Sequence, residues 1–119
     1  MDELSYLKQE INQLKSDTYL SYSKKVEIAH KMLLDEKNKL NRLKKIKEKV
    51  LLKLSDCKKR RKKAVLNELL RRLEKKIVVS NQKIIKLNNI FNKYLEDFKR
   101  HREYLGLYDH SFINSFYKD

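Results

Sequence analysis

The sequence of residues 66–112 is LNELLRRLEKKIVVSNQKIIKLNNIFNKYLEDFKRHREYLGLYDHSF, and its apolar side chains recur at alternating intervals of four and three residues. This spacing places them along one face of an α-helix. It predicts continuous helix through Leu105, sheathed by a second helix in knobs-into-holes packing. Only two positions of this stripe, Ser80 and His101, are polar. The stripe consists of Leu66, Leu70, Leu73, Ile77, Ser80, Ile84, Leu87, Phe91, Tyr94, Phe98, His101, Leu105, Tyr108 and Phe112.

A second apolar stripe precedes the first. It begins at Tyr22 and ends at Cys57, with Glu36 and Lys47 at two positions where the pattern expects apolar residues. This regularity predicts a helix over residues 18–56. Its apolar members are Tyr22, Val26, Ala29, Leu33, Leu40, Leu43, Val50, Leu54 and Cys57.

The heptad phase breaks between the two stripes, near Ser55 and Asp56, and either of these residues can cap the start of a following helix. We therefore expect the helix over 18–56 to fold back on a helix over 57–105, so that each covers the stripe of the other. The alternative is one long bent rod whose stripes are covered by another subunit.

The N-terminal segment carries a short stripe of its own. Four apolar residues follow a 3-4-3 spacing, but eight residues rather than seven separate Leu14 from Tyr22. The slip falls in the segment 16–18 (Ser-Asp-Thr), whose residue types favour caps and turns. We therefore expect a separate short helix over 1–17. Its stripe is Leu4, Leu7, Ile11 and Leu14.

The C-terminal segment 106–119 is rich in aromatic residues. Gly106 stands where a C-cap glycine would end the long helix, and Asp109 or Ser111 is suited to cap a short terminal helix. An apolar terminus is not expected to remain in solvent. Either it folds back over the base of the hairpin, or it inserts into a groove on a partner. Its apolar side chains include Phe112, Ile113, Phe116 and Tyr117.

The fold class that follows is all-α: a long antiparallel helical hairpin or coiled coil, with a short N-terminal helix and a short aromatic C-terminal helix. The 119 residues are enough for a single domain. The chain has no proline and one glycine, so few residues are available to break helices or form sharp turns.

Charge is the strongest functional indication. The net charge is +14, and the segment 58–76 alone holds ten Lys or Arg against two acids, Glu68 and Glu74. A helix face of this kind favours contact with phosphates, most readily those of structured RNA, without reading bases. The alternatives are a solvated basic helix end and a nuclear-import signal at 58–63. The predicted nucleic-acid-binding residues are Lys58, Lys59, Arg60, Arg61, Lys62, Lys63, Arg71, Arg72, Lys75 and Lys76.

A second basic stretch lies in the preceding helix, and we interpret it as an ordinary solvated face. It comprises Arg42, Lys44, Lys45, Lys47 and Lys49. The apolar stripe and the aromatic tail instead favour a protein partner, a helix or a groove. The predicted partner-binding residues are Leu66, Leu70, Leu73, Ile77, Ile84, Leu87, Phe91, Tyr94, Phe98, Leu105, Phe112, Phe116 and Tyr117.

No pattern of catalytic residues is apparent, so we expect no enzyme, no cofactor, no metal and no small-molecule substrate. His30, His101 and His110 do not share a zinc-ligand spacing with Cys57, and we expect His101 to be a packed, hydrogen-bonded core residue. The single cysteine, the acidic start and the absence of a long apolar run favour an intracellular protein, cytoplasmic or nuclear, rather than a membrane protein.

Two functions fit these observations. The first is a structural protein that binds RNA phosphates as a component of, or factor on, a ribosome-like ribonucleoprotein assembly. The second is a coiled-coil scaffold or adaptor in a protein complex, cytoskeletal or kinetochore-like, without a nucleic-acid role. Binding to an anionic membrane is disfavoured because the apolar stripe is narrow and regular.

Overall fold

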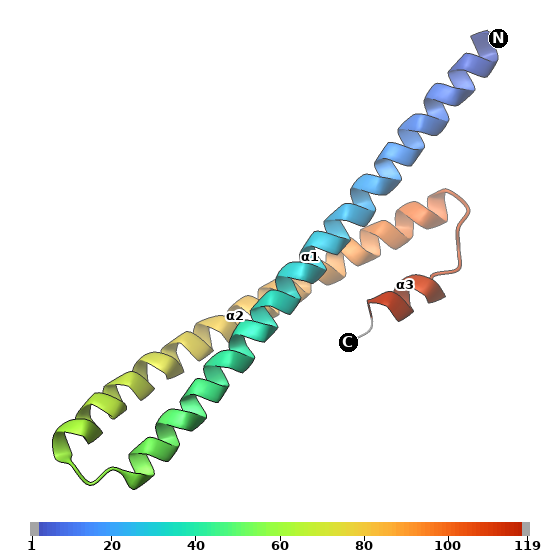
Figure 1. Ribbon diagram of the computed structural model, residues 1–119. Coiled ribbons are helices and arrows are strands. Elements are labelled where there is room, and N and C mark those ends of the chain that lie inside the picture. The colour runs from blue at the N-terminus through green and yellow to red at the C-terminus, as the bar shows by residue number, and fades with distance from the viewer. Residues whose placement is uncertain (1–2, 118–119) are drawn as a thin grey trace. The chain divides into compact units, whose positions relative to one another are not determined.

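The computed structural model describes residues 3–117 and confirms the all-α class. Within that range the chain forms three helices and no strand, and the two long helices are antiparallel (Figure 1). None of these helices has an apolar stretch long enough to cross a membrane. The helices are α1 (Glu3–Asp56), α2 (Arg60–Tyr104) and α3 (Ser111–Phe116).

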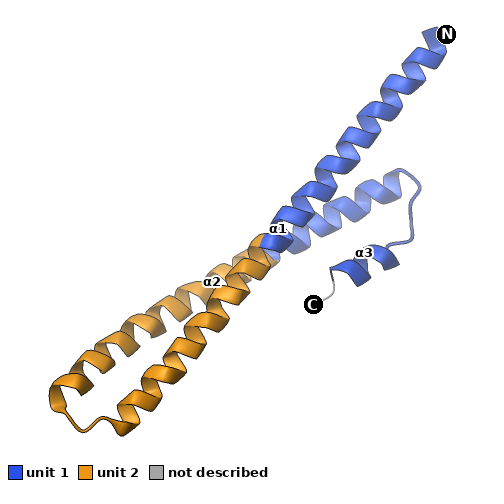
Figure 2. Cartoon of the chain, in the orientation of Figure 1, with its two compact units in different colours: residues 1–31, 89–119 blue, residues 32–88 orange. Residues whose placement is uncertain are grey.

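The chain divides into two compact units, coloured separately in Figure 2. Unit 1 combines residues 1–31 with 89–119, and unit 2 consists of residues 32–88. Each long helix contributes to both units, because α1 begins in unit 1 and α2 ends there.

Unit 2 is a helical hairpin, as the sequence predicts. The last part of α1 and the first part of α2 are joined by the three residues 57–59, at the break in the heptad phase. The expected cap is wrong, however, because α2 begins at Arg60 and both Ser55 and Asp56 belong to α1. The Ser55 hydroxyl donates to the Leu52 carbonyl oxygen at 2.7 Å, so it is engaged within its own helix.

The helix that covers the stripe of α2 is α1 of the same chain. In unit 2, Leu33, Leu40 and Val50 of α1 are buried, and so is Leu73 of α2. Every stripe position of α2 from Leu66 to His101 is buried or half-buried, and so is Leu105 just after the helix. Burying a side chain of this size contributes about 1.5–3 kcal/mol, so the two stripes supply most of the stability of the hairpin.

The polar residues within the stripes of unit 2 face each other. The buried Ser80 hydroxyl donates to Oε1 of Glu36 at 2.8 Å. Lys47 Nζ lies 3.7 Å from Oε1 of Glu74, across the hairpin. Two of the positions at which α1 departs from the apolar pattern are therefore satisfied by the facing helix, which keeps their polar groups from being buried without a partner.

The separate N-terminal helix expected over 1–17 is a wrong prediction. Residues 3–17 are the first part of the unbroken α1, and positions 1 and 2 lie outside the described range. The Thr18 hydroxyl donates to the Leu14 carbonyl oxygen at 2.8 Å, and Gln13 Nε2 donates to Asp17 Oδ1 at 3.1 Å. These turn-favouring side chains form their hydrogen bonds along the helix, which therefore continues through them.

The C-terminal end of α2 is closed by Gly106, as predicted. Gly106 has φ +87°, a conformation that glycine adopts without strain. Its N–H donates to the Glu103 carbonyl oxygen at 2.9 Å, and the Leu107 N–H donates to that of Arg102 at 2.8 Å. This pair of bonds is a Schellman motif, and it ends α2 one residue before the expected Leu105.

The aromatic tail folds back onto unit 1, although only in part. Ile113 of α3 is buried, and the Tyr117 ring lies 5.0 Å from the His30 ring and 5.6 Å from the Phe91 ring. Phe112 and Phe116 remain exposed. The prediction that Asp109 or Ser111 caps α3 is wrong, because the N-cap is His110, whose side chain makes no capping hydrogen bond. Asp109, one residue earlier, accepts a hydrogen bond from the Ser111 N–H at 3.0 Å.

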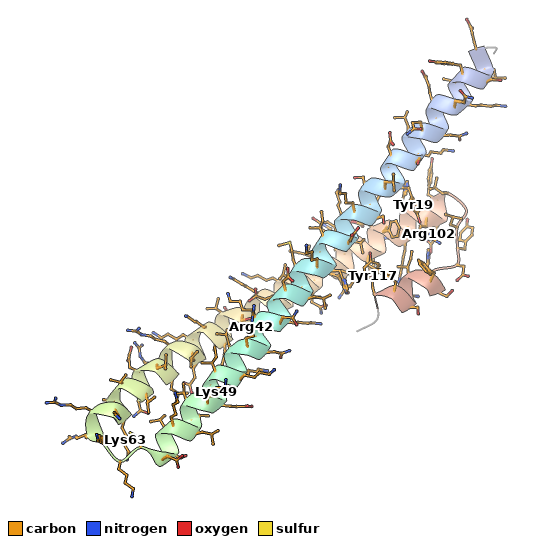
Figure 3. All side chains as sticks on the ribbon, in the orientation of Figure 1. Tyr19, Arg42, Lys49, Lys63, Arg102 and Tyr117 are labelled. Atoms are coloured by element: carbon orange, nitrogen blue, oxygen red, sulfur yellow. The ribbon has the colours of Figure 1, made fainter. Side chains whose placement is uncertain are left out.

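Arg102 connects the tail to both long helices of unit 1. Its guanidinium donates to the Tyr19 hydroxyl at 2.7 Å and to the Asp109 carbonyl oxygen at 2.9 Å. Its Nε also donates to Nδ1 of His110 at 3.4 Å. Figure 3 labels Arg102 and Tyr19, whose side chains lie close together. One side chain thus joins α1, α2 and the segment that leads into α3.

The expectation for His101 is only partly met. Its ring stacks on Tyr22 at 4.8 Å, as suits a packed residue between two helices. Its buried Nε2, however, has no hydrogen-bond partner among residues 3–117. Aromatic packing, rather than a hydrogen bond at this nitrogen, holds the ring in place.

The apolar contact of the hairpin is tested by Leu33→Ala, since Leu33 is 1% exposed while the adjacent Leu34 is 41% exposed. Leu33→Ala is expected to lower the free energy of unfolding by about 3 kcal/mol, measured by urea titration, because it leaves a cavity. Leu34→Ala is the matched control and is expected to cost less than about 1 kcal/mol. Equal losses for the two variants would contradict the packing described for unit 2.

The role of Arg102 is tested by hydrogen exchange in Arg102→Ala. Loss of its charged hydrogen bonds is expected to speed exchange of the α3 amides at least about tenfold, with α1 and α2 of unit 2 unchanged. Arg100→Ala is the control, because Arg100 is exposed and lies 4.0 Å from Glu96 of its own helix. Unchanged exchange in α3 of Arg102→Ala would contradict a role of Arg102 in holding the tail.

Candidate nucleic-acid interface

The two units differ sharply in charge. Unit 2 holds 20 Lys and Arg against 6 Asp and Glu, which equals the +14 net charge of the whole chain. Unit 1 holds 10 of each and is neutral. The sequence alone places an excess of +8 in residues 58–76, but the contribution of the facing helix follows only from the fold. Any polyanion is therefore attracted to unit 2.

The basic run 58–63 forms the tip of the hairpin, and all six of its side chains are exposed. Lys58 and Lys59 lie in the connection, and the other four residues form the first turn of α2. That turn contains no acid, and Lys59, which precedes it, has no side-chain acceptor for the first N–H groups of the helix. The positive end of the helix dipole repels these four cations, and the cations also repel one another. A bound anion would reduce both repulsions.

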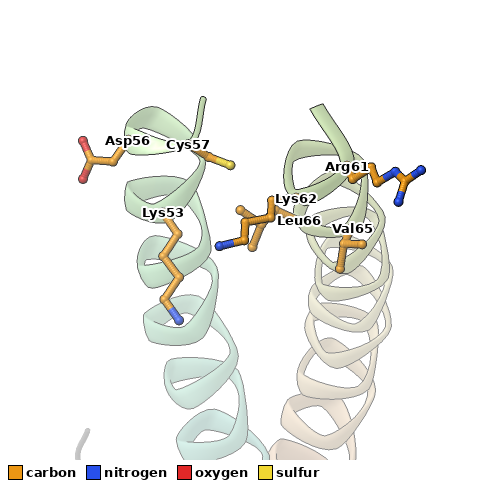
Figure 4. Close-up of a pocket in the computed structure, with 7 residues that line it drawn as sticks. All are labelled: Lys53, Asp56, Cys57, Arg61, Lys62, Val65 and Leu66. Carbon is orange, nitrogen blue, oxygen red and sulfur yellow. The ribbon is translucent and has the colours of Figure 1, made fainter. Parts of the chain in front are cut away.

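A hollow of about 570 Å³ lies at the tip, between the end of α1 and the start of α2 (Figure 4). In this view the Cys57 thiol points toward α2 and the Lys62 side chain extends into the space between the helices, whereas Asp56 and Arg61 point away from it. The hollow therefore combines a cationic group with an apolar wall. It is lined by Lys53, Asp56, Cys57, Arg61, Lys62, Val65 and Leu66.

Arg71 and Arg72, two of the predicted phosphate-binding residues, are engaged by an acid of their own helix. Arg71 donates from Nη2 and Nε to the two carboxylate oxygens of Glu68, at 2.6 and 3.1 Å. Arg72 Nε lies 3.3 Å from the same carboxylate. The hydrogen bond from Arg71 is the main reason that the pKa of Glu68 falls to about 2, so this carboxylate stays ionised at neutral pH and competes with phosphate.

The remaining predicted cations, Lys75 and Lys76, are exposed on α2. Across the hairpin, the stretch 42–49 of α1 belongs to the same unit, and its Lys47 pairs with Glu74. Figure 3 shows the labelled Arg42 and Lys49 on this part of α1. The other four cations of this stretch are exposed, as expected of a solvated face.

A second hollow in unit 2 is lined by three cations, Lys39, Lys83 and Lys86, that were not predicted from the sequence. Two lysines of α2, Lys83 and Lys86, line it together with Lys39 and Arg42 of α1. Its volume is about 620 Å³. The signal that would have identified it is the pairing of the two helices, because these four cations come from segments more than 40 residues apart. Two acids, Asp35 and Glu36, and two apolar residues complete its lining.

The predicted partner-binding residues fall into two groups. Eleven of the thirteen are buried or half-buried, mostly in the stripe that α1 covers. Only Phe112 and Phe116 are exposed, and their rings stack at 6.3 Å. The partner helix required by the stripe of α2 is thus present in the same chain, and the surface left for another protein in this set is the pair of phenylalanines.

The histidines are engaged in packing or hydrogen bonds. His30 lies between Phe91 and Tyr117, and His110 Nε2 lies 3.1 Å from a carboxylate oxygen of Glu103. Among residues 3–117, no three His, Cys, Asp or Glu side chains cluster as a metal site requires.

No family model, curated protein or solved structure matches this chain. The distribution of charge and exposed surface is therefore what bears on its function.

The competition by Glu68 is tested by Glu68→Gln. The change removes the negative charge that the guanidinium groups of Arg71 and Arg72 contact. It is expected to raise the affinity for an RNA stem-loop roughly threefold, measured by fluorescence anisotropy. Glu96→Gln is the matched control, since it also removes one exposed acid that lies near an arginine, but in unit 1. An affinity for Glu68→Gln that equals that of the control would mean that the two arginines do not take part in binding.

Proposed function

We propose that this chain is a non-enzymatic structural protein that binds the phosphates of structured RNA through unit 2. In this role it is a component of, or a factor on, a ribosome-like ribonucleoprotein assembly. The observation that carries the proposal is that the entire net charge of +14 belongs to the 57-residue hairpin 32–88, while unit 1 is neutral. A basic surface that contacts only solvent does not require the net charge to be concentrated in one unit.

The tip of the hairpin supports this proposal most directly. Residues 58–63 hold six consecutive cations, four of them at the positive end of the α2 dipole. Such an arrangement lowers the stability of the first turn of α2. Residues that destabilise their own secondary structure are concentrated at functional sites. A phosphate at the tip offsets both the repulsion between the cations and the unfavourable dipole contact.

The type of contact follows from the side chains. Lysines and arginines on the exposed faces of two helices reach phosphate oxygens, which position a protein but carry no sequence information. No aromatic side chain lies between residues 32 and 88, so unit 2 has no platform on which unpaired bases could stack. These features favour a duplex region of RNA, recognised through its backbone.

A second candidate function is a protein adaptor, as in the coiled-coil scaffold considered above. The observation in its favour is that Phe112 and Phe116 are exposed on the neutral unit 1. The two functions are compatible, because the aromatic pair and the basic hairpin belong to different units. RNA binding by unit 2 is expected only of the first candidate, because the adaptor function requires no nucleic acid.

The proposal is tested by titrating a structured RNA stem-loop into the full chain at several salt concentrations. The affinity is expected to fall steeply with salt, and Arg60→Glu/Arg61→Glu is expected to weaken binding at least about tenfold and to reduce the slope by about 2. Acids in the first turn of α2 also favour its dipole, so this variant is expected to be no less stable than the natural chain.

The matched control is Lys24→Glu/Lys31→Glu, which changes the net charge by the same amount with exposed residues of unit 1. Its affinity is expected to lie within about twofold of the natural chain. Equal losses in the two double variants would show a general effect of net charge and contradict a site at the tip. Equal affinity for a DNA duplex would contradict the preference for RNA.

A further inference from the structure

The first four turns of α1 carry an apolar stripe that nothing in the described chain covers. Leu4, Leu7, Ile11 and Leu14 are 61%, 52%, 42% and 65% exposed. All side chains from residue 3 to residue 18 are exposed. Figure 2 shows this part of α1 without another helix of unit 1 beside it. This stripe is offset by one residue from the α1 stripe that begins at Tyr22 and packs on α2, but it belongs to the same unbroken helix.

The charges beside this stripe are ordered. When Leu4 and Ile11 are assigned to heptad position a and Leu7 and Leu14 to position d, the flanking e and g positions hold every charge of residues 3–17. All e positions are lysines and all g positions are acids, while the outer b, c and f positions are uncharged. The e positions are Lys8 and Lys15, and the g positions are Glu3, Glu10 and Asp17.

We propose that residues 3–17 form a parallel, in-register two-stranded coiled coil with a second copy of this chain. In such a pair, each g residue faces the e′ residue five positions later on the partner helix. Glu3 therefore faces Lys8, and Glu10 faces Lys15, in both directions across the seam. Two heptads thus supply four complementary pairs with no like-charge contact among them.

The orientation follows from the same charges. In an antiparallel pair, g positions face g′ positions and e positions face e′ positions, so acids would meet acids and lysines would meet lysines. No residue of 3–17 in the e and g positions forms an ion pair within residues 3–117. Asp17 accepts a hydrogen bond from Gln13, but the charges of the four proposed pairs are available to a partner. Isoleucine at an a position with leucine at both d positions also favours two parallel strands.

Net charge does not oppose association at this segment. A charge of +14 repels copies of the chain, but unit 2 holds it all, and residues 3–17 carry three acids against two lysines. Two heptads are short for an isolated coiled coil, yet the segment is already helical as part of the 54-residue α1, so pairing does not require a new helix to nucleate. We therefore expect a reversible dimer with a modest affinity.

The test is sedimentation equilibrium of the full chain from micromolar to millimolar concentration. The expected result is a monomer of 14.5 kDa in equilibrium with a species of twice that mass. Lys8→Glu/Lys15→Glu and Glu3→Lys/Glu10→Lys are each expected to weaken dimerisation at least about tenfold, because every pair becomes a like-charge pair. Mixing the two variants is expected to restore dimers, since all four pairs are then complementary.

Lys24→Glu/Lys31→Glu controls for net charge and is expected to dimerise like the natural chain. Circular dichroism is expected to stay unchanged in all variants, because residues 3–17 are exposed and do not pack on α2. A chain that stays monomeric at every concentration would overturn the proposal. Dimers that persist in both charge-reversed variants, or a mixture that stays monomeric, would overturn it equally.

Orientation is tested in a Cys57→Ser background. Leu4→Cys is expected to form a disulfide-linked dimer on oxidation, because identical a positions lie side by side only in a parallel pair. In an antiparallel pair, residue 4 would face residue 14, about 15 Å along the helix from its own copy. Cross-linking that requires a mixture of Leu4→Cys and Leu14→Cys chains would overturn the parallel arrangement.

Discussion

The covering of the α2 stripe by α1 is the contact on which the rest of the structure depends. Neither helix could keep its apolar face in water without losing many kcal/mol, and the 3-4 spacing fixes which face each presents. Folding α1 back on α2 also gathers the basic residues of both helices into one unit. The charge of residues 32–88 is set by the sequence, and the packing that stabilises the hairpin brings its two halves side by side.

Polar residues within an apolar contact restrict how two helices can slide. A pair such as Ser80 with Glu36 is satisfied in one alignment, because a shift by one turn would leave the buried Ser80 hydroxyl without its acceptor and place Glu36 against an apolar neighbour. The contact between Lys47 and Glu74 acts at a second point of the same hairpin. The positions that interrupt the apolar pattern thus specify the alignment that the regular positions leave open.

The sequence was sufficient for those features that depend on periodicity. The two stripes, the reversal near residue 57 and the closing Gly106 each follow from spacing or from one residue with special backbone freedom. Features that depend on competing hydrogen bonds were not predictable. Thr18 and Ser55 were expected at turns or caps, yet each donates to a carbonyl oxygen of its own helix, a choice that the residue type alone does not decide.

The candidate site was predictable in its location but not in its composition. The run of six cations can be read directly from the sequence, whereas the hydrogen bonding of Arg71 to Glu68 depends on side-chain geometry. The contributions of Lys39, Lys83 and Lys86 depend on which segments the fold brings together. The basic residues of unit 2 therefore come from both of its antiparallel helices. Unit 1 has no such excess of charge, so its exposed apolar side chains, such as Phe112 and Phe116, belong to a neutral unit.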